Sequence, residues 1–308
     1  MKRLLLLLLA ACSGGDEVCE LDGKFCDRLS SYHMLDDAIA YDVNTPLFSD
    51  YTTKQRSIYL PPGATMTWSD TGAFAMPVGA AVIKTFAYPE QPLETRLLVK
   101  TASGWTGASY VHDGDDAKLA LAGAQIPVSW GRYNVPNKNQ CKNCHAEHDD
   151  AIDLIGPKAR HLNDGAQLEQ FIAGGILVGA PSPETWPRAP VAMDPASGSL
   201  DARARAWLDI NCAYCHNSGG GAARTSGLYL DLDSTDFGIC KPPIAAGRGS
   251  GGRAYAIVPG NPDASFLVYR LESTEPEIKM PELGRNLVDA EGVALIREWI
   301  AAIPGSCN

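Results

Sequence analysis

The sequence predicts a multidomain chain, in which an N-terminal all-β domain, an antiparallel sandwich or barrel, is followed by mostly α-helical domains. Three observations support this prediction. Short strand-like runs separated by Gly and Pro fill residues 57–130, where no helical periodicity of useful length occurs. After residue 137, apolar residues recur at helical spacing in several stretches. With 308 residues, the chain is long enough for two or three domains.

Residues 1–11 have the pattern of an export signal. Lys2 and Arg3 precede six leucines and small residues, and the apolar run is too short to span a bilayer. Residues 9–12, Leu-Ala-Ala-Cys, resemble a bacterial lipobox, which implies cleavage before Cys12 and lipidation of its thiol. An ordinary signal peptide with an incidental cysteine is the alternative. With the lipobox, residues 12–30 form a tether to the periplasmic face of a bacterial membrane, the outer membrane being one option.

The β-rich domain is placed at residues 31–136. Residues 81–86, Ala-Val-Ile-Lys-Thr-Phe, form a short run of apolar and β-branched residues. Residues 96–100 and 106–111 flank a Ser-Gly turn signal at 103–104, so they predict a β-hairpin.

Two pentapeptides carry the strongest chemical signal. Residues 141–145, Cys-Lys-Asn-Cys-His, and 212–216, Cys-Ala-Tyr-Cys-His, both match C-x-x-C-H, the attachment signature of c-type haem. Residues three and four apart share one face of a helix, so two thiols can form thioethers with one porphyrin while the histidine binds the iron. A zinc site or a redox dithiol is the alternative, but neither zinc-finger spacing nor a thioredoxin-like context is present. The sequence therefore predicts two covalently bound c-type haems, on Cys141, Cys144, Cys212 and Cys215, with His145 and His216 as iron ligands.

Each motif lies in its own predicted haem domain, the first at residues 137–199 and the second at 200–308. In the first domain, a helical pattern at 167–172 is followed by a loop that contains Met193. A helix predicted at 200–210 leads from there to the second motif.

The second domain follows a similar order. A helical pattern starts near Asp263, and a loop that contains Met280 follows it. A closing helix is predicted at 289–302, with Asp289 as its N-cap.

The order of motif, methionine loop and closing helix resembles class I cytochrome c domains over residues 137–303. Gly-Pro-Lys at 156–158 and Lys-Met-Pro at 279–281 are similar to two loops of those domains. The whole chain also resembles a family of uncharacterised bacterial dihaem lipoproteins, at residues 41–51, 139–145 and 202–208. These resemblances imply cytochrome c-like helical domains and add nothing about a particular activity.

The resemblance also implies a methionine as the sixth iron ligand. Met280 is expected to bind the second iron, because a proline and the closing helix follow it. Met193 occupies the matching place for the first iron, although Asp194 follows it instead of a proline. His161, His148 or an open iron are the alternatives for the first haem.

The remaining cysteines number four: Cys19, Cys26, Cys240 and Cys307. They allow three pairings in an oxidising compartment. The local pair Cys19–Cys26 together with Cys240–Cys307 is favoured, and free buried thiols are the alternative.

The composition limits the partners. The net charge is −10, and no basic run or basic–aromatic stripe occurs, so nucleic acid is not expected. An acidic surface favours a basic redox protein as the partner. Residues 247–252 fit G-x-G-x-x-G without the strand and helix of a dinucleotide site, so Arg248 or Arg253 could instead pair with a haem propionate.

These observations favour one-electron transfer by a membrane-anchored periplasmic dihaem c-type protein. No catalytic residue is assigned, and electron transfer is favoured over catalysis. Two alternatives stay open. One is a dihaem peroxidase-like oxidoreductase with one open haem iron, and the other is a ligand-binding β-domain with the haems as reporters.

Overall fold

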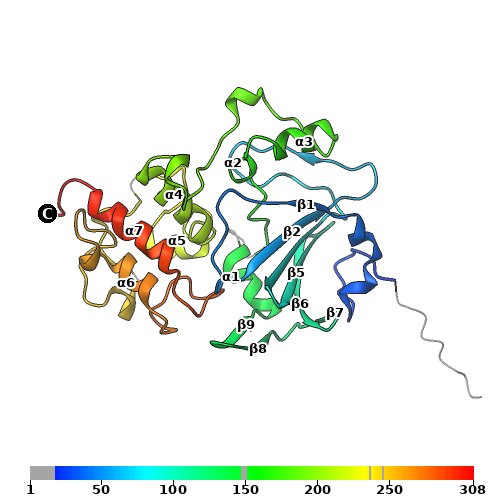
Figure 1. Cartoon of the computed structure of the whole chain (residues 1–308), viewed down its shortest axis with the longest axis horizontal. Coiled ribbons are helices and arrows are strands. Elements are labelled where there is room, and N and C mark those ends of the chain that lie inside the picture. Colours follow the sequence, from blue (N-terminus) through cyan, green and yellow to red (C-terminus); the bar gives the residue numbers. More distant parts are fainter. Residues whose placement is uncertain (1–17, 147–150, 236, 245) are drawn as a thin grey trace, which may run out of the picture.

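The largest element of the computed structural model is a six-stranded antiparallel sheet with the order β1-β2-β4-β5-β6-β7 (Figure 1). The structure describes residues 18–146, 151–235, 237–244 and 246–308. The sheet consists of β1 (Ile39–Tyr41), β2 (Thr53–Tyr59), β4 (Ala81–Tyr88), β5 (Gln91–Thr101), β6 (Gly104–Asp113) and β7 (Asp116–Leu119). Two smaller pairs are the antiparallel β8 (Ala124–Val128) with β9 (Gly131–Val135), and the parallel β3 (Met66–Thr67) with β10 (Leu177–Val178).

The hairpin predicted around residues 103–104 is confirmed. Strands β5 and β6 pair antiparallel from Thr101 opposite Gly104 to Glu94 opposite Val111. Gly104 has a φ of +120°, which an L side chain rarely adopts, and so the glycine suits this tight turn.

One face of the sheet forms an apolar core with the N-terminal segment. Tyr110 is fully buried and contacts the ring of Tyr32 edge to face. The disulfide Cys19–Cys26 closes this segment, which also contains the 3-10 helices Leu29–Ser31 and His33–Asp37. The alternating residues Ala81, Ile83, Leu97, Val99, Ala108, Tyr110 and Ala117 supply the sheet's part of this core.

A second core joins the sheet region to residues after the first motif. Helices α2 (Ala159–Leu162) and α3 (Gln167–Ala173) pack against strands β2 and β3, and β10 pairs with β3. The sequence-based domain boundaries remain predictions. The apolar packing described here joins residues on both sides of the predicted boundary between residues 136 and 137.

Helices α4 (Leu200–Asn211), α5 (Gly221–Ser226), α6 (Phe266–Glu272) and α7 (Ala290–Ala302) lie together on one side of the molecule (Figure 1). The predicted N-cap is confirmed, because the Asp289 side chain accepts a hydrogen bond from Gly292 N. Helices α4 and α7 share a core with Trp207, Ile296 and Ile300. The disulfide Cys240–Cys307 fastens the end of the chain to this lobe, so the favoured disulfide pairing is confirmed.

The remaining helical pieces are short. Helix α1 covers Cys141–His145. Further 3-10 helices cover Lys138–Gln140, Pro183–Thr185, Pro195–Ser197, Gly247–Ser250 and Pro262–Ala264. In the described ranges, no helix combines the length and apolar character needed to cross a bilayer.

The predicted fold class is wrong in two respects. The β part is one open twisted sheet with two small strand pairs, and not a sandwich or barrel, because the N-terminal segment and helices cover its faces. The rest is not a set of mostly α cytochrome c-like domains. Residues 179–199 and the described part of 227–265 contain many glycines and prolines, which interrupt the helical pattern and leave long loops between short helices.

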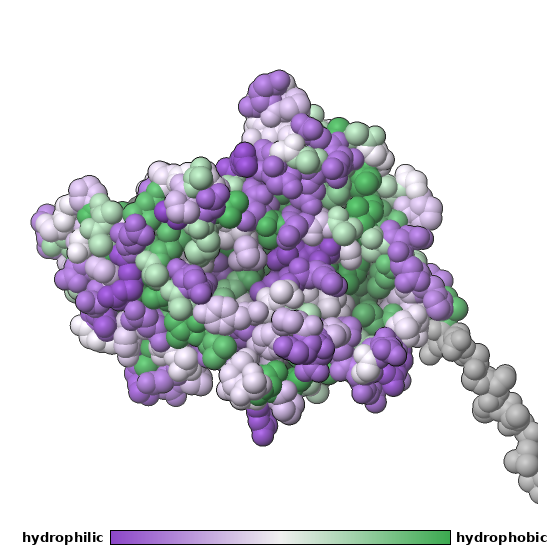
Figure 2. Space-filling view, in the orientation of Figure 1, coloured by the Kyte–Doolittle hydropathy of each residue, from purple (hydrophilic) through white to green (hydrophobic). Residues whose placement is uncertain are grey.

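The sheet region and the helical lobe are linked by a buried carboxylate. Asp50 Oδ1 accepts hydrogen bonds from Asn286 N at 2.6 Å and Leu287 N at 2.7 Å, and its side chain is almost inaccessible to solvent. Nearby, Phe48 N donates to Asn211 Oδ1 at the end of α4 at 2.8 Å. The visible outer surface is mostly hydrophilic with smaller apolar patches (Figure 2).

We predict that Asp50→Ala lowers the free energy of unfolding by roughly 2–3 kcal/mol, because two partly buried backbone N–H groups lose their acceptor. Asp50→Asn is the matched control: it keeps an acceptor oxygen and tolerates the φ of +52° at this position. We expect about half the loss for this variant. Urea unfolding of the purified proteins measures both values, and equal losses for the two variants would contradict the assigned role.

Candidate functional site

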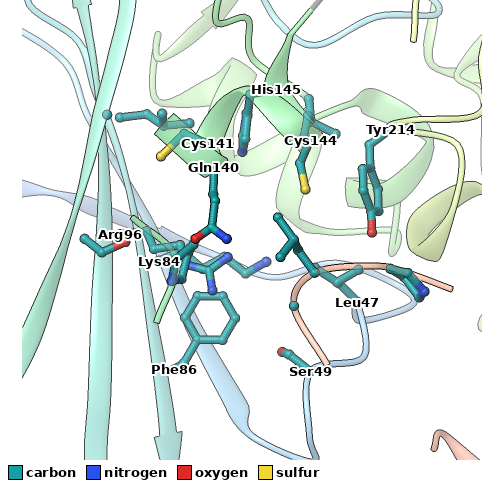
Figure 3. A pocket seen from close by; sticks show the side chains of 18 of the residues that line it. Leu47, Ser49, Lys84, Phe86, Arg96, Gln140, Cys141, Cys144, His145 and Tyr214 are labelled. Carbon is teal, nitrogen blue, oxygen red and sulfur yellow. The ribbon is translucent and has the colours of Figure 1, made fainter. Parts of the chain in front are cut away.

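A capping box begins the 3-10 helix Lys138–Gln140, which leads directly into α1. Asn137 and Gln140 form a capping box, in which the Asn137 side chain accepts from Gln140 N and the Gln140 side chain accepts from Asn137 N. The first motif follows directly in α1. Figure 3 shows Cys141, Cys144 and His145 directed from this helix into one cavity.

His145 is held in one orientation. Its Nδ1 lies 3.0 Å from the carbonyl oxygen of Asp153, and because a carbonyl only accepts, Nδ1 carries the proton. Burial lowers the pKa of His145 to about 4, against the effect of this hydrogen bond, so the imidazole is neutral at pH 7. The lone pair therefore lies on Nε2, the arrangement found in metal-ligating histidines.

The second motif repeats this arrangement on a different support. The turn at residues 212–216 follows α4, and His216 N donates to Cys212 O at 3.0 Å. His216 Nδ1 lies 3.1 Å from Leu228 O, which again leaves the proton on Nδ1. Burial lowers the pKa of His216 too, so both motif histidines are neutral imidazoles with Nδ1 occupied.

Two cavities contain the motifs. The first, of about 710 Å³, lies between the sheet and α1 and contains Cys141, Cys144 and His145. The second, of about 370 Å³, lies in the helical lobe and contains Cys212, Cys215 and His216. Both volumes are in the range of roughly 300–1,000 Å³ that is usual for ligand and cofactor sites.

The two cavities are neighbours. Cys144 and Tyr214 line both of them. Cys215 Sγ donates to Asn143 O at 3.1 Å, and hydrogen bonding between the Cys144 and Cys215 thiols lowers the pKa of Cys144. The structure therefore brings the two motifs into direct contact, although Asn143 and Cys215 are 72 positions apart in sequence.

The structure separates the two methionines that the sequence singled out. Met280 lines the second cavity together with Cys212, Cys215 and His216. The Met193 side chain is 47% exposed and lines neither cavity. Cys12 and His148 lie outside the described residues.

The Met280 loop is held by one arginine. Arg285 is buried, and its guanidinium donates to Met280 O at 2.7 Å. Met280 N in turn donates to Arg270 O at 3.1 Å. The carbonyl acceptors of Arg285 are those of Arg270, Leu271, Ser273, Met280 and Leu287.

His161 lines the first cavity beside a buried acid. Its Nε2 lies 2.5 Å from Asp209 Oδ2, and its Nδ1 is buried without a hydrogen-bond partner among the described residues. The hydrogen bond with His161 helps to lower the pKa of Asp209 against the effect of burial, so Asp209 is ionised at pH 7. This pair connects helices α2 and α4 at the wall of the cavity.

Sequence reasoning missed the polar wall of the first cavity. Arg56, Lys84 and Arg96 line it from three neighbouring strands, and Lys84 interrupts the apolar run at 81–86 that predicted β4. This lysine within an apolar run was the sequence signal that could have indicated the polar wall. Arg248 pairs with Glu277, Arg253 contacts Tyr269, and neither arginine lines either of these two cavities.

Comparisons with known proteins give no relative. No family model, no curated protein and no solved structure matches the chain. Among the described residues, no group of three or more His, Cys, Asp and Glu side chains could hold a metal ion. With the sheet-dominated fold, these findings make the assignment to class I cytochrome c domains and the dihaem lipoprotein family wrong, and with it the description as a metal-binding cytochrome c.

We predict that Arg285→Lys lowers the free energy of unfolding by roughly 2–3 kcal/mol, because an ammonium group has three donors and cannot serve all the carbonyls that the guanidinium binds. Arg248→Lys is the matched control, since Arg248 is exposed and its ion pair with Glu277 is worth less than about 1 kcal/mol. Urea unfolding gives both values, and hydrogen exchange should be faster at the Met280 amide only in Arg285→Lys. Equal effects of the two substitutions would contradict a special role for Arg285.

Proposed function

We propose that the chain carries two covalently bound c-type haems and works in one-electron transfer. The thioether-forming residues are Cys141 and Cys144 for the first haem, and Cys212 and Cys215 for the second. One observation carries the proposal: each motif places both thiols and a neutral imidazole on the wall of one cavity, with Nδ1 bonded to a backbone carbonyl. In that state Nε2 of His145 and of His216 is available to iron.

The residues present fit a haem in a way that does not depend on a cytochrome c fold. Iron in a porphyrin needs only one or two protein ligands, so a cluster of three or more side chains is not required. The thiols lie on one helical turn at each motif, as the two thioethers demand. When bound, each haem supplies a reversible ferric–ferrous couple.

The protein's own residues orient the two imidazoles and bring the two motifs together. The carbonyls of Asp153 and Leu228 hold the imidazoles in one tautomer. Contact between the Cys144 and Cys215 side chains brings the two attachment edges together. A short distance between two redox groups favours electron exchange inside one molecule. The arrangement therefore supports electron transfer between the two proposed haems more than storage of an electron on one of them.

Met280 is the proposed sixth ligand of the second iron, because it lines the cavity that contains His216. A thioether ligand raises the reduction potential and occupies the position where small molecules would bind. The hydrogen bonds from Arg285 fix the backbone on which Met280 stands. Met193 is left out of the proposal, because its side chain lies outside both cavities.

We further propose export and anchoring by lipid on Cys12, which places the protein at the periplasmic face of a bacterial membrane. The net charge of −10 favours a basic redox protein as the partner, and nucleic acid is not proposed. The disulfides Cys19–Cys26 and Cys240–Cys307 support an oxidising compartment.

A second candidate function is a dihaem peroxidase-like oxidoreductase. It is favoured by the first cavity, which is the larger of the two and is lined by no methionine among the described residues. The buried pair His161–Asp209 lies on its wall and is suited to hold a proton next to a small substrate. On this alternative, the first iron keeps an open position.

We predict that haem stain survives denaturing gel electrophoresis of the wild type. It should persist at about half strength in Cys141→Ala/Cys144→Ala and in Cys212→Ala/Cys215→Ala, since each pair holds its own haem. It should vanish only when both pairs are changed. Complete loss of stain in either single pair, with protein still present on an immunoblot, would contradict two independent attachment sites.

We predict that Met280→Ala opens the second iron, lowers its reduction potential and lets it bind carbon monoxide. The weak methionine-to-iron absorption band in the red should disappear, while Met193→Ala, the matched control, should leave it unchanged. Visible spectroscopy with a redox titration measures these changes. A band that survives Met280→Ala would refute the ligand assignment, and an open, peroxide-reactive iron already present in the wild type would favour the second candidate function.

A further inference from the structure

The face of the sheet opposite the apolar core carries three adjacent cations. Arg56 on β2 is paired in register with Lys84 on β4, and Lys84 with Arg96 on β5. All three line the first cavity. Like charges directly opposite each other on neighbouring strands are destabilising, so this row costs the fold stability. We call these three residues the cation row.

Two members of the row are neutralised by acids. Arg56 Nη1 lies 2.9 Å from Asp42 Oδ1. Arg96 binds Glu94 through Nε at 3.0 Å and Nη2 at 2.6 Å, and Glu94 is fully buried. These pairs use the guanidinium groups, and the charge of Glu94 acts on the middle member without forming an ion pair with it.

Lys84 lies in that middle position. The structure shows its ammonium 5.0 Å from the centre of the Phe86 ring, and no acid or hydrogen-bond acceptor is within contact distance among the described residues. Burial, and then the charges of Arg56 and Arg96, lower the pKa of Lys84 well below its usual value. An anion beside Lys84 would reduce this cost, because charge-assisted pairs are stronger than neutral hydrogen bonds.

The position of the cation row indicates which kind of anion would bind there. Figure 3 shows Cys141, Cys144 and His145 entering the cavity from one side, and Lys84, Phe86 and Arg96 lying across from them. A haem held at its vinyl edge has its two propionate carboxylates at the opposite edge. Thioether formation at α1 therefore directs the carboxylates toward the sheet.

We propose that the cation row is a carboxylate-binding site that receives the propionates of the haem attached to Cys141 and Cys144, with Lys84 as the direct ion partner. This inference rests on the proposed function. It explains why a lysine lies in the apolar run of β4, where a strand of the core would otherwise carry an apolar side chain.

The test uses the haem-loaded protein and three variants. Lys84→Met keeps the length of the side chain and removes the charge, and Lys84→Arg keeps the charge. Lys100→Met is the matched control, because Lys100 lies on the same face of β5 next to Trp105 but outside the cavity. Haem stain establishes that the first haem is attached in each variant.

Resonance Raman spectroscopy then reports the propionate bending modes, and a redox titration reports the potential of the first haem. We expect Lys84→Met to shift the bending mode and to lower that potential, since loss of a nearby positive charge favours the ferric form. Lys84→Arg should restore both, and Lys100→Met should change neither. Should Lys84→Met not fold, Lys84→Gln replaces it in the same measurements.

The outcomes separate this inference from the proposed function. An unchanged bending mode in Lys84→Met, with the first haem attached, overturns the carboxylate site and leaves the haem assignment intact. A wild-type spectrum that responds to added acetate, while the propionate mode ignores Lys84→Met, assigns the row to a free carboxylate and also overturns it. Absence of stain at the first motif in the wild type refutes the proposed function itself.

Discussion

The pairing register of β2, β4 and β5 determines which side chains lie on each face of the sheet. Because side chains alternate, the register that places Ala81, Ile83 and Leu97 in the apolar core places Lys84 and Arg96 on the cavity wall. A slip by one residue would exchange the two faces, and the apolar N-terminal segment would then meet charged groups. The core that stabilises the sheet is therefore also the constraint that assembles the polar wall of the cavity.

In both motifs, the histidine is oriented by a backbone carbonyl and not by a side chain. His145 and His216 are each oriented by the carbonyl of a residue 8 or 12 positions later, at Asp153 and Leu228. A carbonyl cannot change its protonation state, so the tautomer of each imidazole is insensitive to pH. The same principle recurs at Arg285, which binds the carbonyls around Met280. In both arrangements, backbone carbonyls fix the position of a cavity-lining group, and the charges on the protein surface do not affect these acceptors.

The sequence predicted features that depend on near neighbours. The hairpin at Ser103 and Gly104, the cap at Asp289 and the helical spacing of the motif residues all follow from local rules. The open sheet, the Met193 side chain outside both cavities and the contact of Cys144 with Cys215 depend on packing between segments that are distant in sequence. The cation row belongs to the same group, because only cross-strand register brings Arg56, Lys84 and Arg96 together. Local patterns contain no information on which strand lies next to which.

The first cavity takes its walls from segments along most of the chain: the loop at 47–49, the sheet, α1, the end of α4 and residues 279–286. On the proposed export route, the N-terminus would leave the membrane first and these segments would follow one after another. The motif at 141–145 would then reach the far side of the membrane well before the last wall segment. The Asp50 contacts to Asn286 and Leu287 need that last segment, so on this route the cavity would close near the end of translocation.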